Sequence, residues 1–89
     1  MNSYELVFIL KEDKEDQLKK IADVITSMQG AVENKTGWGK KTFAYPIKKH
    51  DAGYYYLWNF SMAPQGLKEF KKKLAYDEDI IRYLLLNLD

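Results

Sequence analysis

Residues 54–62, YYYLWNFSM, alternate between two sets of side chains, and this alternation decides the fold. A period of two residues over a run of aromatic and apolar side chains predicts a β-strand. One face of the strand carries the bulk that a small core needs, so we predict that it is buried: Tyr54, Tyr56, Trp58, Phe60 and Met62. The other face carries Tyr55, Leu57, Asn59 and Ser61.

The segment before this strand predicts its hairpin partner. Residues 31–45, AVENKTGWGKKTFAY, indicate a long strand with a bulge or bend at Gly37-Trp38-Gly39, because glycine tolerates such a backbone. Pro46 has no N–H to donate, so we predict that ladder pairing stops there. The turn residues KKHDAG, 48–53, then lead into the strand at 54–62.

On each side of this hairpin, the sequence predicts one helix and one further strand. Residues 4–10, YELVFIL, form an almost continuous apolar run that is typical of a central strand. Asp13 is expected to cap the following helix and Gly30 to end it. Pro64 is expected in the first turn of the second helix, and residues 80–88, IIRYLLLNL, form the last strand. The apolar stripes are Leu18, Ile21, Ala22, Val24, Ile25 and Met28 in the first helix, and Leu67, Phe70 and Leu74 in the second.

The order strand–helix–strand–strand–helix–strand predicts an α+β fold. Two split strand–helix–strand units with right-handed crossovers form one four-stranded antiparallel sheet with both helices on one face. This arrangement is the ferredoxin-like sandwich, which we expect as a single domain over residues 1–89. Since the helices cover only one face of the sheet, the other face is where we expect the function.

Composition excludes several classes of protein. The 14 Lys and Arg residues nearly balance the 13 Asp and Glu residues, and a net charge of +1 does not predict nucleic-acid binding by bulk charge. The absence of cysteine excludes a disulfide framework and a thiolate metal site. The N-terminal apolar run, Leu6 to Leu10, is too short for a signal peptide or a transmembrane helix. We therefore expect a cytosolic protein without a membrane partner.

No constellation of residues predicts catalysis, a cofactor, a metal site or a small-molecule substrate. His50 is the only histidine, and it lies in the predicted turn without a nucleophile or carboxylate partner. The acidic clusters at 12–16 and 77–79 lack the spacing of a calcium loop and fit helix capping and an acidic turn. Gly37 and Gly39 lie between strand residues rather than before a helix, so they predict no phosphate loop. An acylphosphatase-like enzyme or a small-molecule sensor would need an anion loop or a polar pocket, which the sequence does not indicate.

Two groups of residues are candidates for binding. The lysines at the two ends of the hairpin, with Tyr45 between them, fit a solvated rim and phosphate contacts equally well: Lys40, Lys41, Lys48 and Lys49. An apolar patch on the helix-free face is typical of a partner surface, and it would consist of Val7, Ile9, Tyr55, Leu57 and Leu84.

The RNA-recognition motif has the same order of elements, but its signature on the third strand is absent. When Gly53 is aligned with the glycine of that signature, Tyr55 falls where a small residue is required, and Asn59 falls where a stacking ring is required. We therefore do not expect bases to stack on the sheet face in the manner of that motif.

The hairpin contains the motif Ala-Tyr-Pro-Ile, residues 44–47, with the basic pair Lys40-Lys41 shortly before it. Further features are Tyr4-Glu5 in the first strand, Lys48-Lys49 in the loop, Tyr55–Asn59 in the third strand, Pro64 at the second helix and Ile80-Ile81-Arg82 in the last strand. With these features the chain resembles, over essentially its whole length, the bacterial-type ribosomal protein S6 family of the small ribosomal subunit.

This resemblance implies a role in RNA binding without catalysis. Proteins of the family bind the central domain of small-subunit rRNA as a heterodimer with ribosomal protein S18, and their low net charge is typical because a basic partner shares the RNA. We expect RNA contacts from Lys40, Lys41, Tyr45, Lys48, Lys49 and Arg82, and S18 contacts from the helix-free face.

Two departures from the family limit what is carried over. Asn2 and Ser3 stand where many relatives have arginine or histidine, so we expect no N-terminal RNA contact. The chain ends directly after the last strand, so we expect no contact from an extended tail. The alternative interpretation is a ferredoxin-like protein-interaction module without RNA binding, such as a self-associating sensory domain.

Overall fold

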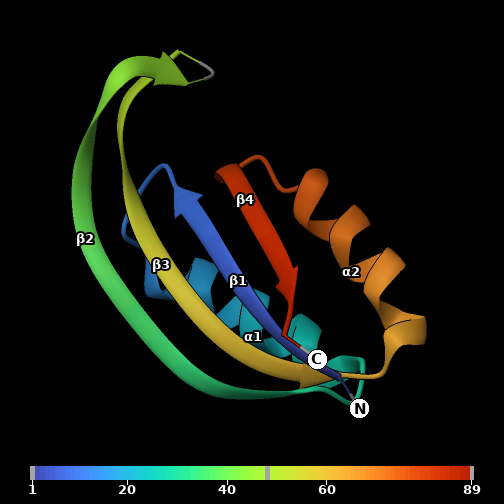
Figure 1. The fold of residues 1–89 in the computed structure, drawn as a ribbon. Helices are drawn as coiled ribbons and strands as arrows, with labels where there is room; N and C mark the ends of the chain where they lie inside the picture. Colours follow the sequence, from blue (N-terminus) through green and yellow to red (C-terminus); the bar gives the residue numbers. More distant parts are fainter. Residues whose placement is uncertain (1, 48, 89) are drawn as a thin grey trace.

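The chain folds into six elements, and the computed structural model describes residues 2–47 and 49–88. In chain order the elements are β1 (Asn2–Leu10), α1 (Glu15–Ser27), β2 (Ala31–Ile47), β3 (His50–Met62), α2 (Pro64–Ala75) and β4 (Ile80–Asn87) (Figure 1). The predicted order of elements and the α+β fold are confirmed. The hairpin strands are longer than predicted, because β2 continues past Tyr45 and β3 begins at His50.

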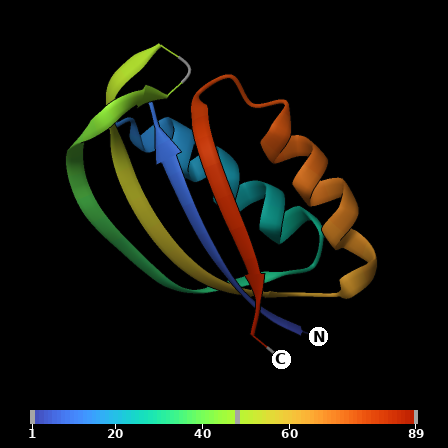
Figure 2. The same cartoon turned by 45° about the horizontal axis from the view of Figure 1, so that its top comes forward.

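The four strands form one antiparallel sheet in the order β2-β3-β1-β4. β1 lies inside the sheet, as predicted for a central strand, and its Leu6 is opposite Trp58 of β3 and Leu85 of β4. Both helices lie on the same face of the sheet, as the two views show (Figure 1 and Figure 2). No helix in the described part of the chain covers the opposite face, which we call the open face.

The alternate side chains of β1 and β3 fill the layer between the sheet and the helices. Trp58 is 2% exposed, and its ring meets Phe8 edge to face, with the ring centroids 5.2 Å apart. Phe60 meets Phe70 of α2 in a similar way, at 5.3 Å. Such a pair contributes about 0.5–1.5 kcal/mol beyond the burial of its area. The predicted core face of β3 is confirmed, and its buried members are Tyr56, Trp58, Phe60 and Met62.

The start of α1 differs from the prediction in its capping residue. The N-cap is Lys14, and no side chain caps the helix there. Asp13 lies just before it, and its Oδ1 accepts a hydrogen bond of 2.5 Å from the Tyr56 hydroxyl. The prediction that Asp13 caps the helix was therefore wrong, because its carboxylate bonds to the sheet instead. Glu15 and Asp16 lie in the first turn as predicted, where the helix dipole favours negative charge.

The end of α1 is a Schellman turn in which Gln29, not Gly30, takes the left-handed conformation, with φ of 63°. The Gly30 N–H donates to the Ile25 carbonyl at 2.9 Å, and the Gln29 N–H donates to the Thr26 carbonyl at 3.0 Å. Glycine is needed at position 30 for a different reason from the one predicted. A Cβ there would lie only 2.6 Å from the backbone oxygen of Ser61.

Among the described residues, the ladder between β2 and β3 is interrupted in three places; one lies between Val32 and Asn34, and the other two contain glycine or proline. The register shifts between Gly37 and Gly39, which confirms the predicted bulge, and Gly39 has a φ of 80°. The third shift spans Pro46, where pairing was predicted to stop. Pairing nevertheless resumes beyond the proline, with Ile47 opposite His50, so the expectation of a turn at 48–53 was too long.

Candidate RNA and partner interface

A row of apolar side chains crosses the open face. Val7 of β1 lies opposite both Leu57 of β3 and Leu84 of β4, and residues opposite one another share a face. Leu84 is 55% exposed, while Val7 and Leu57 are half-buried. Leu86 continues the row along β4; it was not predicted, although its alternation with Leu84 in the sequence could have indicated it. We call Val7, Leu57, Leu84 and Leu86 the apolar row.

Ile9 lies on the open face with the apolar row but is only 6% exposed. It is covered because side chains from two other segments converge on the same place. A Cβ built on Gly53 would lie 3.0 Å from the Phe43 ring and 3.2 Å from the Ile81 side chain, and it would overlap with Ile9. A partner cannot reach Ile9 while Phe43 and Ile81 remain there. This geometry does not support Ile9 as part of the partner surface.

The far end of the β2–β3 hairpin bends toward β1 and β4, as both views show (Figure 1 and Figure 2). Gly53 permits this bend, since a side chain at that position would hold Phe43 away from Ile9. Residues at the end of one edge strand, β2, thereby come near residues of the other edge strand, β4.

An aromatic cluster lies next to this bend on the open face. The rings of Trp38 and Tyr55 are stacked, with centroids 6.5 Å apart and an interplanar angle of 19°. Phe43 meets the same Tyr55 ring at 6.1 Å and 61°. Tyr55, which was predicted to bind a partner, is therefore half-buried between two rings of β2. Trp38 is 47% exposed and was not predicted as a binding residue, because the sequence placed it only in a bulge.

A surface hollow forms where the bent hairpin faces β4, and we call it the hairpin hollow. Its lining brings together Tyr45 and Arg82, two residues predicted to contact RNA. The Tyr45 side chain is 83% exposed. The complete lining is Thr42, Phe43, Ala44, Tyr45, Pro46, Tyr55 and Arg82.

Arg82 is exposed and has no ion-pair partner among the residues that the structure describes. A salt bridge to Glu5 would have been the simplest structural role for this arginine. In the observed register, however, Arg82 lies opposite Ile9, whereas Glu5 lies opposite Leu86. The guanidinium is therefore available to an external anion.

The predicted lysines are separated by the hairpin. Lys41 pairs with Gly53, on the open face, whereas Lys40 pairs with Tyr54, whose ring packs toward the helix-side core. Neighbouring residues in a strand point to opposite faces, so the structure brings Lys41, but not Lys40, to the face of Arg82. Lys49 is exposed beyond the end of β2, with φ of 68°. Lys48 was also predicted to contact RNA and lies outside the described residues.

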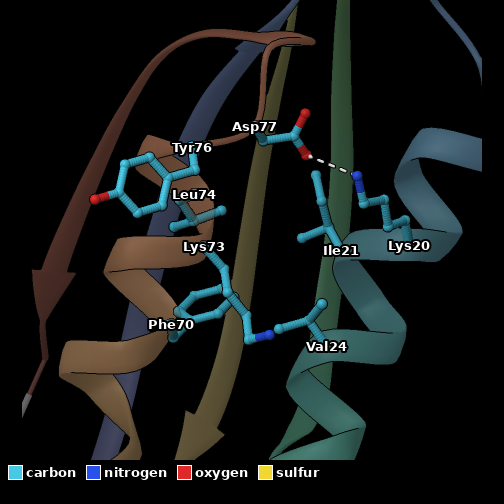
Figure 3. A pocket seen from close by; sticks show the side chains of 8 residues that line it. All are labelled: Lys20, Ile21, Val24, Phe70, Lys73, Leu74, Tyr76 and Asp77. Atoms are coloured by element: carbon cyan, nitrogen blue, oxygen red, sulfur yellow. Dashed lines mark ion pairs between the residues drawn. The ribbon is translucent and has the colours of Figure 1, made fainter.

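A second hollow lies between the two helices, away from the predicted site residues (Figure 3). Its floor is apolar, and its polar edge joins the helices: Lys20 Nζ lies 3.8 Å from Asp77 Oδ2, and Gln17 Nε2 donates to the same oxygen at 2.5 Å. Asp77 lies just beyond Tyr76, the C-cap of α2, so these contacts tie α1 to the segment between α2 and β4. We interpret this hollow as part of the helix packing.

Neither a metal centre nor a membrane-spanning helix is found in the described residues. No group of three or more His, Cys, Asp or Glu residues in residues 2–47 and 49–88 could hold a metal ion. Neither of the described helices is long and apolar enough to cross a membrane.

Comparison with known proteins gives the same result from sequence and from fold. A family model described as Ribosomal protein S6 matches residues 3–87. The chain is 40% identical over 93 residues to the small ribosomal subunit protein bS6 of Alkaliphilus oremlandii, covering 100% of this chain and 99% of that protein. It is 35% identical over 94 residues to bS6 of Moorella thermoacetica, covering 100% and 96%. The crystal structure of 30S ribosomal protein S6 from Thermotoga maritima superimposes with a TM-score of 0.87 at 25% identity, covering 97% of this chain and 86% of that one.

Proposed function

Because the chain belongs to the ribosomal protein S6 family, whose members are non-enzymatic components of the small ribosomal subunit, we propose that it binds the central domain of small-subunit rRNA together with ribosomal protein S18. The observation that carries the proposal is that the open face holds two adjoining surfaces of different chemistry. The apolar row and the hairpin hollow meet on β4, where Leu84 and Arg82 lie on the same face two residues apart.

The apolar row is the surface proposed to bind S18. Leu84 is more than half exposed in a small domain whose other large apolar side chains are mostly buried, and an open apolar patch is typical of a partner surface. Leu57 and Val7 lie beside it, so a partner covering Leu84 would also cover a continuous apolar strip across β3, β1 and β4. Removing this strip from water supplies the free energy of the contact.

The hairpin hollow and the lysines beside it are the surface proposed to bind rRNA. The net charge of +1 makes non-specific attraction to RNA weak, so binding depends on where the cations lie. Arg82 and Lys41 share the open face and have no ion-pair partner among the described residues. Phosphate contacts of this kind position a protein on RNA without reading its sequence.

Reconstitution with purified components tests this function. A fragment of the rRNA central domain is titrated with the chain alone, with S18 alone and with both proteins. We expect measurable binding of the chain only when S18 is present, and co-migration of all three components. If the mixture does not bind the fragment, the RNA part of the proposal is wrong. If the chain nevertheless forms a stable complex with S18, it acts as a protein-interaction module.

A charge placed in the apolar row tests whether this surface, rather than another part of the chain, binds S18. Leu84→Asp should weaken the complex with S18, because a carboxylate would be buried against an apolar surface. Gln65→Asp introduces the same charge on an exposed residue of α2 and serves as the control. Equal affinity of both variants for S18 in titration calorimetry would place the partner elsewhere.

A further inference from the structure

Among the described residues, the lining of the hairpin hollow is mostly aromatic or apolar and includes one charged group. Phe43, Tyr45, Pro46 and Tyr55 form the walls, Arg82 supplies the charge, and none of the lining residues in 2–47 and 49–88 carries a carboxylate. The Tyr45 hydroxyl makes no hydrogen bond to any residue that the structure describes, and its ring is 83% exposed. The Tyr45 ring and the Arg82 guanidinium are thus both exposed to solvent in the hairpin hollow.

These two groups match the two parts of a nucleotide. In single-stranded RNA, an unstacked base can lie against the ring of an aromatic side chain. A guanidinium binds a phosphate through two parallel hydrogen bonds, which fixes direction as well as charge. Tyr45 and Arg82 line the same hollow, so one nucleotide can contact both.

A base-paired helix would not use the rings of this hollow. Its bases are stacked on one another, and the major groove of A-form RNA is too deep and narrow for side chains to read. Contacts to a helical backbone need cations alone, which exposed lysines such as Lys41 already supply. The aromatic walls therefore favour a base that has left the stack.

A side chain of a partner protein would suit this hollow less well. An apolar side chain would fill the walls but would also remove the Arg82 guanidinium from water without a counter-charge, which is unfavourable. Lys41 lies on the same face of the sheet, so this face carries a second cation besides Arg82. Because the described lining of the hollow carries a cation and no carboxylate, an anionic group is the favoured occupant.

We propose that the hairpin hollow binds one unpaired nucleotide of the rRNA, with its base stacked on Tyr45 and its phosphate held by Arg82. This inference rests on the proposed function and identifies the form of RNA that its basic surface recognises. The stacking ring belongs to the end of β2, so the site differs from that of the RNA-recognition motif, whose stacking positions on the third strand are not matched here.

Three variants test the nucleotide site in the heterodimer with S18: Tyr45→Leu, Tyr45→Phe and Arg82→Gln. Affinity for the central-domain rRNA fragment is measured across a series of salt concentrations. Tyr45→Leu should weaken binding about 5- to 100-fold with an unchanged salt slope, because stacking carries no charge. Tyr45→Phe retains the ring and should bind within about twofold of the parent. Arg82→Gln should weaken binding and make the slope shallower by about 0.7–0.9.

The outcomes separate this inference from the proposed function. Absence of RNA binding by the parent heterodimer would overturn both. Parental binding with Tyr45→Leu unaffected would overturn the nucleotide site alone. Weaker binding of Tyr45→Leu to S18 without RNA would also overturn it, since the hollow would then hold a protein side chain. Because Tyr45 is exposed, thermal melts of all three variants should match the parent and exclude unfolding as the cause.

Discussion

Tyr56 joins the core of the sheet to the segment before α1. Its ring is buried on the helix side of β3, where it stacks against Phe8 at 5.3 Å, and its hydroxyl donates to Asp13. Burial and then this hydrogen bond raise the pKa of Tyr56 from 10.0 to about 12. Both causes favour the neutral phenol, so ionisation is harder in the folded chain than in the unfolded one.

Stability should therefore depend on Tyr56 at alkaline pH. Because the folded-state pKa is raised, the contribution of Tyr56 is fully present below about pH 10 and is lost as the pH rises toward about 12. Tyr56→Phe should lower the free energy of unfolding by about 1 kcal/mol at neutral pH, through loss of the hydrogen bond to Asp13. Urea denaturation at a series of pH values checks this. The difference between parent and variant should shrink above pH 10, and a constant difference would contradict the pKa assignment.

Gly53 should be the most sensitive glycine of the hairpin. Gly53→Ala places a methyl group among Ile9, Phe43 and Ile81, and we expect a loss of about 1–3 kcal/mol from overpacking or from displacement of the hairpin end. Gly37→Ala is the matched control, because its Cβ would lie 3.4 Å from the Tyr56 ring. Denaturant melts should separate the two variants. Equal stability would mean that the hairpin end does not pack on Ile9.

At the scale of the elements, β2 presents its two neighbouring lysines to different faces. Lys41→Ala should make the salt dependence of heterodimer binding to rRNA shallower by about 0.7–0.9, because it removes the phosphate contact that we propose for the open face. Lys40→Ala removes the same charge from the other face and should leave the slope unchanged. Both residues are exposed, so melting should change little in either variant. An equal loss of slope in both variants would show that RNA wraps around the β2 edge.

Strands were predictable from the sequence wherever the side chains alternated with a clear period of two residues. The alternation from Tyr54 to Met62 predicted both the strand and its buried face, because only one side of the sheet is covered by helices. The glycines at 37 and 39 predicted the bulge for a local reason, namely the backbone that they permit.

The bend of the hairpin was not predictable, and neither was the use of Asp13 to bind Tyr56 instead of capping α1. Both depend on contacts between distant segments. Asp13 has the side chain of a capping residue, but its partner is Tyr56, 43 positions away. In the sequence Gly53 indicates a turn, whereas in the structure it leaves room for Phe43 above Ile9. The hairpin hollow could not be predicted for the same reason, since the bend is what brings Tyr45 near Arg82.

At the scale of the whole molecule, the sheet separates the buried core under the helices from the open face. Trp58 lies in the core and Trp38 on the open face. Trp58→Ala should lower the free energy of unfolding by about 3–5 kcal/mol, because the ring is 2% exposed in the core. Trp38→Ala removes the same side chain from the open face, where it is 47% exposed, and should cost about 1 kcal/mol or less. Parallel urea melts measure both. A similar loss in the two variants would mean that the aromatic cluster with Tyr55 is a second structural core.

The order of strands in the sheet also has a consequence for synthesis of the protein. β1 is made before the other elements described here and β4 after them, yet they are neighbours in the sheet. While the chain is being translated, β1 can pair with β3, but its other backbone edge stays unpaired until β4 emerges from the ribosome. The apolar row is divided among these same three strands, with Leu84 on the last of them. A nascent chain therefore presents the complete apolar row only after β4 has emerged, and the binding of S18 that we propose should follow the release of β4 rather than accompany translation.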